Sequence, residues 1–300
     1  MNVEEFVDLH VHIGPEVLPR KYTVPGIVEA ERGEMAGLAL KNHFYPTTSL
    51  IETAETTDEL HLVGSVTLNN YVGGLNPDAV YATALLTDLP SIVWFPTLTI
   101  DNFVEHHDWE IPVEWLGFAG VEEGDMADLD WVRPVDEIDP VTVTDDDGEL
   151  VSAAVEVIDA VAENDCVLAT GHVAWEDGRT LVEAAVRRGV ESVIVTHPIW
   201  EPIDMPVEVQ AELGTYDGVY LEQNFAMHHI DDVPMERIAS QIDHVGPENC
   251  IVSSDVGQKT SPDPSEAMAR FADELLARGL SEREIETMAV ENPRTILGVD

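Results

Sequence analysis

The chain has 300 residues, of which 44% are hydrophobic, so it can bury a large core in one barrel-sized domain or two smaller ones. It carries 59 acidic residues against 14 Lys and Arg, a formal net charge of -45, which disfavours binding to nucleic acids and to anionic membranes. Because the acids are spread along the whole chain, we interpret them as an adaptation to high salt rather than an interaction tail, and we expect a halophilic protein.

The cysteines and the N-terminus predict the compartment. Cys166 and Cys250 lie inside the apolar runs "DCVLATG" and "NCIVSSD", which is typical of buried free thiols in a reducing cytoplasm. The opening "MNVEEFVDLH" has no features of a signal peptide, and no apolar stretch reaches 18 residues. We expect a soluble cytoplasmic protein without membrane contact.

Short apolar runs alternate along the chain with amphipathic stretches of helix length, a pattern typical of parallel βα units. The predicted strands cover residues 6–12, 38–41, 62–68, 92–95, 166–169, 192–195, 219–222 and 250–253, and the predicted helices cover 24–32, 48–57, 77–86, 151–163, 180–188, 207–213, 235–245, 265–278 and 282–288. Eight βα units match the number and size of a (β/α)8 TIM barrel, which we predict as a single domain over residues 1–300. An open doubly wound sheet is the alternative, but no Gly-x-Gly-x-x-Gly turn follows the first strand.

The alternation of predicted strands and helices stops after the fourth strand. Residues 99–148 show no clear βα unit, are rich in acids and contain several tryptophans. Such a segment is too long for a bare connection in a compact domain, so we expect it to cover the active site as a lid.

Polar side chains stand where the apolar strands give way to loops. His10 and His12 end the first strand, and the other strand ends carry Lys41 and His43 (second), His172 (fifth), His197 (sixth) and Asp255 (eighth). In a TIM barrel these ends meet at one mouth, where active sites are built.

The two histidines of "DLHVHIGP" are spaced to share one cation, because residues two apart on a strand point to the same side. His172, His197 and Asp255 would complete a set of nitrogen and carboxylate ligands that suits zinc, with manganese, iron or nickel as alternatives. Such a metal lowers the pKa of its bound water to about 7. Asp255 could then act as the base, with His197 or His172 polarising the reacting oxygen.

The chain resembles the amidohydrolase superfamily of metal-dependent TIM-barrel enzymes. In that superfamily His-x-His ends strand one, a His ends each of strands five and six, and an Asp ends strand eight, and these positions match His10, His12, His172, His197 and Asp255. The closing "NPRTILGV" is similar to the usual C-terminal helix. The resemblance implies a hydrolase that cleaves a C–N or C–O bond of an amide, ester or lactone by metal-activated water, without naming its substrate.

Strand four departs from the binuclear members of that superfamily, which bridge two metals with a carboxylated Lys or a Glu at this position. Here the strand reads "SIVWFPTLT". Either the site holds one ion, or Lys41 bridges two ions from strand two. Alternatively, Lys41 forms an ion pair or binds a substrate carboxylate.

Two further residues complete the predicted site, Arg20 and His43, which we expect to contact a small-molecule substrate. A non-hydrolytic lyase such as a decarboxylase is the alternative function, since a cation for a substrate carboxylate would suit it. A non-catalytic metal-binding protein is disfavoured by Asp255, because a purely structural site has no need of a free base. The oligomeric state stays open, with a homo-oligomer as one possibility.

Overall fold

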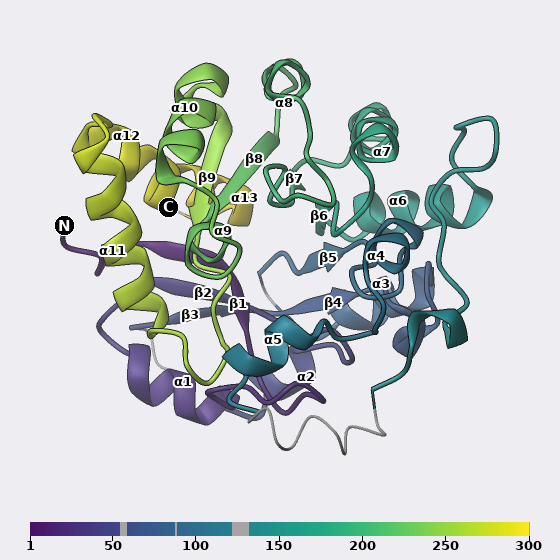
Figure 1. The fold of residues 1–300 in the computed structure, drawn as a ribbon, viewed down its shortest axis with the longest axis horizontal. Coiled ribbons are helices and arrows are strands. Elements are labelled where there is room, and N and C mark those ends of the chain that lie inside the picture. The colour runs from purple at the N-terminus through teal and green to yellow at the C-terminus, as the bar shows by residue number, and fades with distance from the viewer. Residues whose placement is uncertain (55–58, 88, 122–131, 300) are drawn as a thin grey trace.

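The protein, described here by a computed structural model that covers residues 1–300 except 55–58, 88, 122–131 and 300, is built around a ring of parallel strands (Figure 1). The strands are β1 (Val7–His12), β2 (Gly37–Lys41), β3 (His61–Val63), β4 (Ser65–Thr67), β5 (Ile92–Trp94), β6 (Val167–Ala169), β7 (Val193–Val195), β8 (Val219–Asn224) and β9 (Cys250–Ser253). β3 and β4 are two parts of the predicted third strand, separated only by Gly64. A side chain at Gly64 would lie 2.2 Å from Cγ2 of Thr48, so the helix packed beside it demands glycine.

Every paired strand runs parallel to its neighbour, in the orders β1-β2-β3 and β4 through β9. The ring closes between the first and last strands. The amide of His12 donates to the carbonyl of Val256, and the amide of Asp255 donates to the carbonyl of His10, each at 2.8 Å. The eight-stranded barrel predicted from the sequence is therefore confirmed, with its third strand interrupted.

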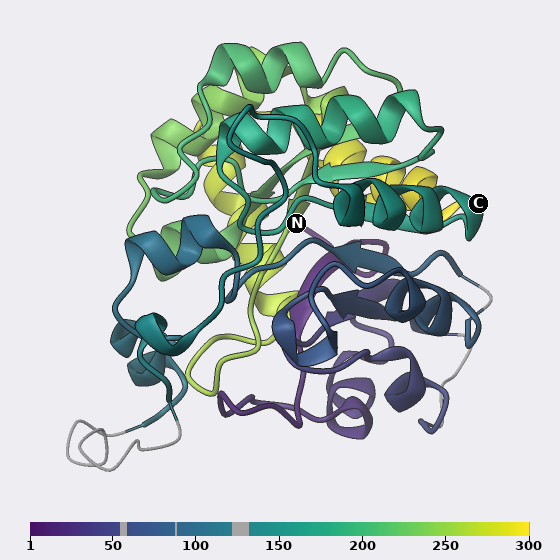
Figure 2. The same cartoon turned by 90° about the vertical axis from the view of Figure 1, so that its right-hand side faces the viewer.

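Helices surround the ring (Figures 1 and 2). They are α1 (Val24–Glu31), α2 (Thr48–Ile51), α3 (Pro77–Ala84), α6 (Ser152–Glu163), α7 (Trp175–Arg187), α8 (Val207–Leu213), α10 (Met235–Val245), α11 (Pro264–Ala277), α12 (Glu282–Glu286) and α13 (Asn292–Leu297). In α10 the residues Met235, Ile238, Ile242 and Val245 are buried, which is the spacing of one helix face packed on a sheet. No helix among the described residues is both long and apolar enough to cross a bilayer.

The core has two layers, set by the alternation of side chains along each strand. In β5, Ile92 and Trp94 point into the barrel, whereas Val93 points outward to the helices. Ile296 and Leu297 of α13 join the inner layer. The last helix therefore contributes to the inner core of the barrel.

Two predicted helix boundaries were wrong. The helix predicted over 48–57 ends at Ile51. The helix predicted over 180–188 begins at Trp175, because Glu176 and Asp177 in its first turn favour the positive end of the helix dipole. The segment 99–148 contains two short helices, α4 (Asp101–His106) and α5 (Val113–Phe118), which its polar composition concealed. Residues 122–131 of that segment lie outside the described residues.

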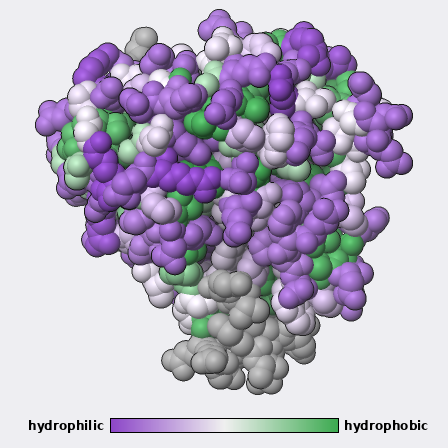
Figure 3. Space-filling model, turned by 45° about the horizontal axis from the view of Figure 1, so that its top comes forward, coloured by the Kyte–Doolittle hydropathy of each residue, from purple (hydrophilic) through white to green (hydrophobic). Residues whose placement is uncertain are grey.

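The outer surface is strongly polar. Hydrophilic residues dominate the face shown in Figure 3, in keeping with the formal charge of -45.

Candidate metal centre at the barrel mouth

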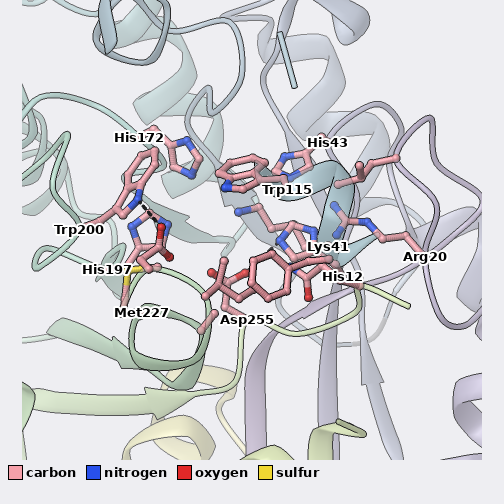
Figure 4. Close-up of a pocket in the computed structure, with 16 residues that line it drawn as sticks. His12, Arg20, Lys41, His43, Trp115, His172, His197, Trp200, Met227 and Asp255 are labelled. Atoms are coloured by element: carbon pink, nitrogen blue, oxygen red, sulfur yellow. Dashed lines mark hydrogen bonds and ion pairs between the residues drawn. The ribbon is translucent and has the colours of Figure 1, made fainter. Parts of the chain in front are cut away.

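The predicted site residues converge on one pocket at the carboxyl ends of the strands (Figure 4). Residues from β1, β2 and the loops after β6, β7 and β9 line it together with side chains of α5 and α9 (Phe225–His229). The lining includes His12, Arg20, Lys41, His43, Trp115, Phe118, His172, His197, Trp200, Met227, Asp231 and Asp255. His10 lies directly beneath, fully buried.

His10, His12 and Asp255 form the tightest group. Oδ1 of Asp255 lies 3.1 Å from Nε2 of His10 and 3.0 Å from Nε2 of His12. All three residues offer ligating atoms within 4.8 Å of one another. The structure therefore brings together three residues that sequence analysis proposed as ligands from opposite ends of the chain.

Glu222, in β8, determines which nitrogen of His10 faces this group. Its Oε1 lies 2.9 Å from Nδ1 of His10 and accepts from Oγ of Ser253 at 2.7 Å, while Oε2 accepts from the backbone amide of His197. Burial alone would raise the pKa of Glu222, but the adjacent His10 and His197, together with the hydrogen bonds from His10 and Ser253, lower that pKa to about 2. An ionised Glu222 accepts a hydrogen bond from Nδ1–H of His10, which leaves a lone pair on Nε2 of that ring.

The free lone pair on Nε2 of His10 favours a cation beside it. Nε2 of His10 and Oδ1 of Asp255 are both acceptors when Asp255 is ionised, and 3.1 Å between two acceptors is stable only with positive charge beside them. Lys41 supplies such a charge, since its Nζ lies 3.0 Å from Nε2 of His10. Two imidazole nitrogens and a carboxylate are equally the donor set of a zinc site, so these residues fit a divalent cation.

His172 and His197 lie on the far side of the pocket, with ring centroids 5.0 Å apart. Neither belongs to a described group of ligating atoms within 4.8 Å. Nδ1 of each is buried without a hydrogen bond among the described residues. Burial lowers the pKa of His197 to about 3 and that of His172 well below its usual value, so both rings are neutral.

A second group shares His12, and contains Glu16 and His43. Glu16 is already engaged, because Oε1 accepts from the backbone amide of His43 at 2.8 Å and Oε2 pairs with Nε of Arg20. Nδ1 of His43 lies 2.9 Å from Oγ1 of Thr97. The adjacent guanidinium disfavours a second divalent cation here.

Two residues at the mouth have unusual backbones. Asp255 has φ 54° and His197 has φ 22°, a region that residues with a side chain rarely adopt. Such strain is concentrated at functional sites. Beside Asp255, Gly257 passes so close to β1 that a Cβ would lie 2.2 Å from the carbonyl oxygen of His12.

Comparison with known sequence families gives one match, over residues 5–222, to the family described as "Family of unknown function (DUF6282)". This match covers well over half of the chain. The chain belongs to DUF6282. No curated protein matches this sequence.

Solved structures share the fold of this DUF6282 chain. An amidohydrolase from Pseudomonas aeruginosa has a TM-score of 0.60 at 10% identity, over 98% of this chain and 97% of that chain. A probable dipeptidase from the same organism has a TM-score of 0.58 at 10% identity, over 97% of this chain and 94% of that chain. The resemblance to the amidohydrolase superfamily is thus confirmed at the level of the fold.

The fourth strand of the barrel, β5, ends at Trp94 and carries no Lys or Glu. The ring of Trp94 lies 4.4 Å from that of His10, and Nζ of Lys41 lies 4.1 Å from the Trp94 ring centroid. Burial lowers the pKa of Lys41 to about 8, an effect that Asp255 and Glu222 partly offset. Trp94 offers no ligand, which favours a single ion.

Sequence reasoning assigned no role to three residues of this site. Glu222 ends a predicted strand, but a strand-end Glu is uninformative in a chain with 59 acids. Glu16 follows the His-x-His motif by four residues, and Trp200 follows His197 by three. Their closeness to predicted strand ends was the only signal that the sequence offered.

Proposed function

We propose that this DUF6282 protein is a metal-dependent hydrolase that cleaves a C–N or C–O bond of a small molecule, as in an amide, ester or lactone. The observation that carries the proposal is the convergence of His10, His12 and Asp255 at the mouth of an amidohydrolase-type barrel. A hydrolase activity is also in keeping with the amidohydrolase and the probable dipeptidase that share the fold.

His10, His12 and Asp255 would hold the cation, because their ligating atoms lie within 4.8 Å of one another. Zinc suits these ligands best, with manganese, iron or nickel as alternatives, and we propose one ion per chain. When bound, the ion acts as a Lewis acid and lowers the pKa of water at the site.

Side chains of the pocket supply the proton transfer and the contacts to the substrate. Asp255 holds the proton taken from water and passes it to the leaving group; its Oδ2 is 3.5 Å from Nδ2 of Asn224, which orients it. His197 is neutral and its Nδ1 has no partner among the described residues, so this ring can hydrogen bond to the substrate. Lys41 places a positive charge beside Nε2 of His10.

A non-hydrolytic lyase is the second candidate, and one observation favours it. Lys41 and Arg20 both line the pocket beside His12 and Asp255. A substrate carboxylate could therefore lie next to the ion and leave as CO₂. A panel of small amides, esters, lactones and carboxylates, followed for both hydrolysis products and CO₂, separates the two reactions.

Metal content tests the site itself. His10→Ala with His12→Ala removes two ligands, so we expect the bound ion to fall from about one per chain to background, as measured by elemental analysis after dialysis in high salt. The matched control is His61→Ala with His244→Ala, which removes two exposed histidines away from the mouth. Equal metal content in the two double variants would show that the site is assigned wrongly.

A further inference from the structure

The mouth pocket is chemically different at its two ends. In Figure 4, Arg20 and His43 lie on one side, Trp200 and Met227 lie on the other, and Asp255 lies between them.

Arg20 forms the cationic end. Its side chain is only 1% exposed, and its Nε is paired with Glu16, whose carboxylate is itself held by the amide of His43. Its two terminal nitrogens form no hydrogen bond with any described residue. The guanidinium is therefore fixed in orientation, with donors that face the cavity and need an acceptor.

The other end is an apolar wall. Trp115 of α5 and Trp200 lie with ring centroids 6.4 Å apart, and the apolar side chains of Phe118 and Met227 also line the pocket. An aromatic or branched apolar group gains most from such a wall. One carboxyl group interrupts it, that of Asp231, whose Oδ1 accepts from Nε1 of Trp200 at 3.3 Å.

We propose that the substrate is a small monocarboxylate whose carboxylate binds Arg20 and whose apolar group packs against Trp115 and Trp200. A carboxylate accepts two parallel hydrogen bonds from a fixed guanidinium, which a neutral amide cannot match. Burial and the charge of Asp255 raise the pKa of Asp231 to about 7. Above that pH Asp231 is ionised and disfavours a second carboxylate at the apolar end, because like charges repel. The inference rests on the proposed function only for placing the bond to be cleaved between these ends, beside Asp255.

Equilibrium binding of three probes tests the proposal. Hippurate joins a carboxylate to an aromatic ring through an amide, hippuramide is its neutral counterpart, and N-(4-carboxybenzoyl)glycine carries a second carboxylate on the ring. By calorimetry with the metal-loaded protein, we expect hippurate to bind about 10- to 100-fold more tightly than hippuramide. We expect the dicarboxylate to bind more weakly than hippurate, and Asp231→Asn to recover part of that loss.

The decisive variant is Arg20→Met combined with Glu16→Gln, which removes the buried ion pair without leaving either charge alone. Hippurate should then bind only as well as hippuramide, whose own affinity should not change. Arg20→Lys, which keeps the charge and loses the planar fork, should give an intermediate affinity and covers the case in which the double variant does not fold.

Equal binding of hippurate and hippuramide to the unaltered protein would overturn the proposal. So would a loss of hippurate binding on metal removal that the Arg20 variants do not reproduce, because the carboxylate would then sit on the ion. If instead Arg20-dependent binding is found but the metal content and hydrolysis tests fail, the proposed function is wrong and the carboxylate site stands.

Discussion

Glu222 in β8 and Glu31 at the end of α1 are both excluded from solvent, yet their surroundings are opposite. Glu222 contacts His10, Ser253 and the amide of His197, and its pKa is lowered to about 2. Around Glu31 the support is much weaker: burial raises its pKa to about 7, and Ser265 offsets only part of that effect.

This difference shows that burial alone does not mark a functional carboxylate. Donors arranged around Glu222 keep it ionised, and the ionised group in turn frees Nε2 of His10 for a cation. Glu31 has no such arrangement and makes the native state less stable once it ionises. Replacing Glu with Gln should therefore weaken metal binding at position 222 and stabilise the native state at position 31.

The largest effect is expected at Asp255. Its Oδ1 lies beside Nε2 of His10, the nitrogen that Glu222 leaves free for the cation. Asp255→Asn should reduce turnover of any compound hydrolysed by the unaltered protein by about 10³-fold or more, with the fold retained, because the proton acceptor is lost. Steady-state kinetics in high salt measures this. The control is Asp232→Asn, an exposed carboxylate in the same region. Turnover near that of the control would remove Asp255 from the role of base.

Glu222→Gln comes next. The amide can donate to Nδ1 of His10, which places the ring proton on Nε2 and blocks it as a ligand. We expect metal affinity to fall about 10- to 100-fold, measured by competition with a chelating dye. Ser253→Ala removes a different contact of Glu222 and should change the affinity far less. If both variants bind metal as the unaltered protein does, Glu222 does not orient His10.

Glu31→Gln should stabilise the protein, but only at higher pH. Because the folded pKa of about 7 lies above the usual 4.5, the native state holds this proton more tightly. Stability is then complete below pH 4.5 and falls as the pH rises through about 7, by roughly 2–3 kcal/mol. Denaturant unfolding should show the variant to be more stable at pH 8 and equal at pH 4.5. A uniform gain at both values would mean that ionisation is not the cause.

The barrel and most of the mouth could be predicted because they depend on local pattern. Apolar runs with period two locate the strands, and β9 has the predicted bounds Cys250–Ser253. The positions of His10, His12 and Asp255 follow from the rule that strand ends converge. Beyond this rule, only the alternation of side chains along a strand is needed.

Contacts between distant strands could not be predicted in this way. Glu222 contacts His10 across 212 residues of sequence, and nothing near either residue reveals the pair. The positions of His172 and His197 relative to the ligand group depend on loop backbones, including the positive φ of His197. The role of Trp94 likewise depends on its inward direction beneath Lys41.

The smallest effect is expected at His43, and it tests a third buried carboxylate. Glu16 resembles Glu222 in having donors at both oxygens, but one of them is the guanidinium of Arg20, whose positive charge disfavours a divalent cation beside it. His43→Ala should therefore leave the metal content at one ion per chain, within the precision of elemental analysis. A fall from two ions to one would instead show that His12, Glu16 and His43 hold a second cation, and that the donors around Glu16 do not exclude it.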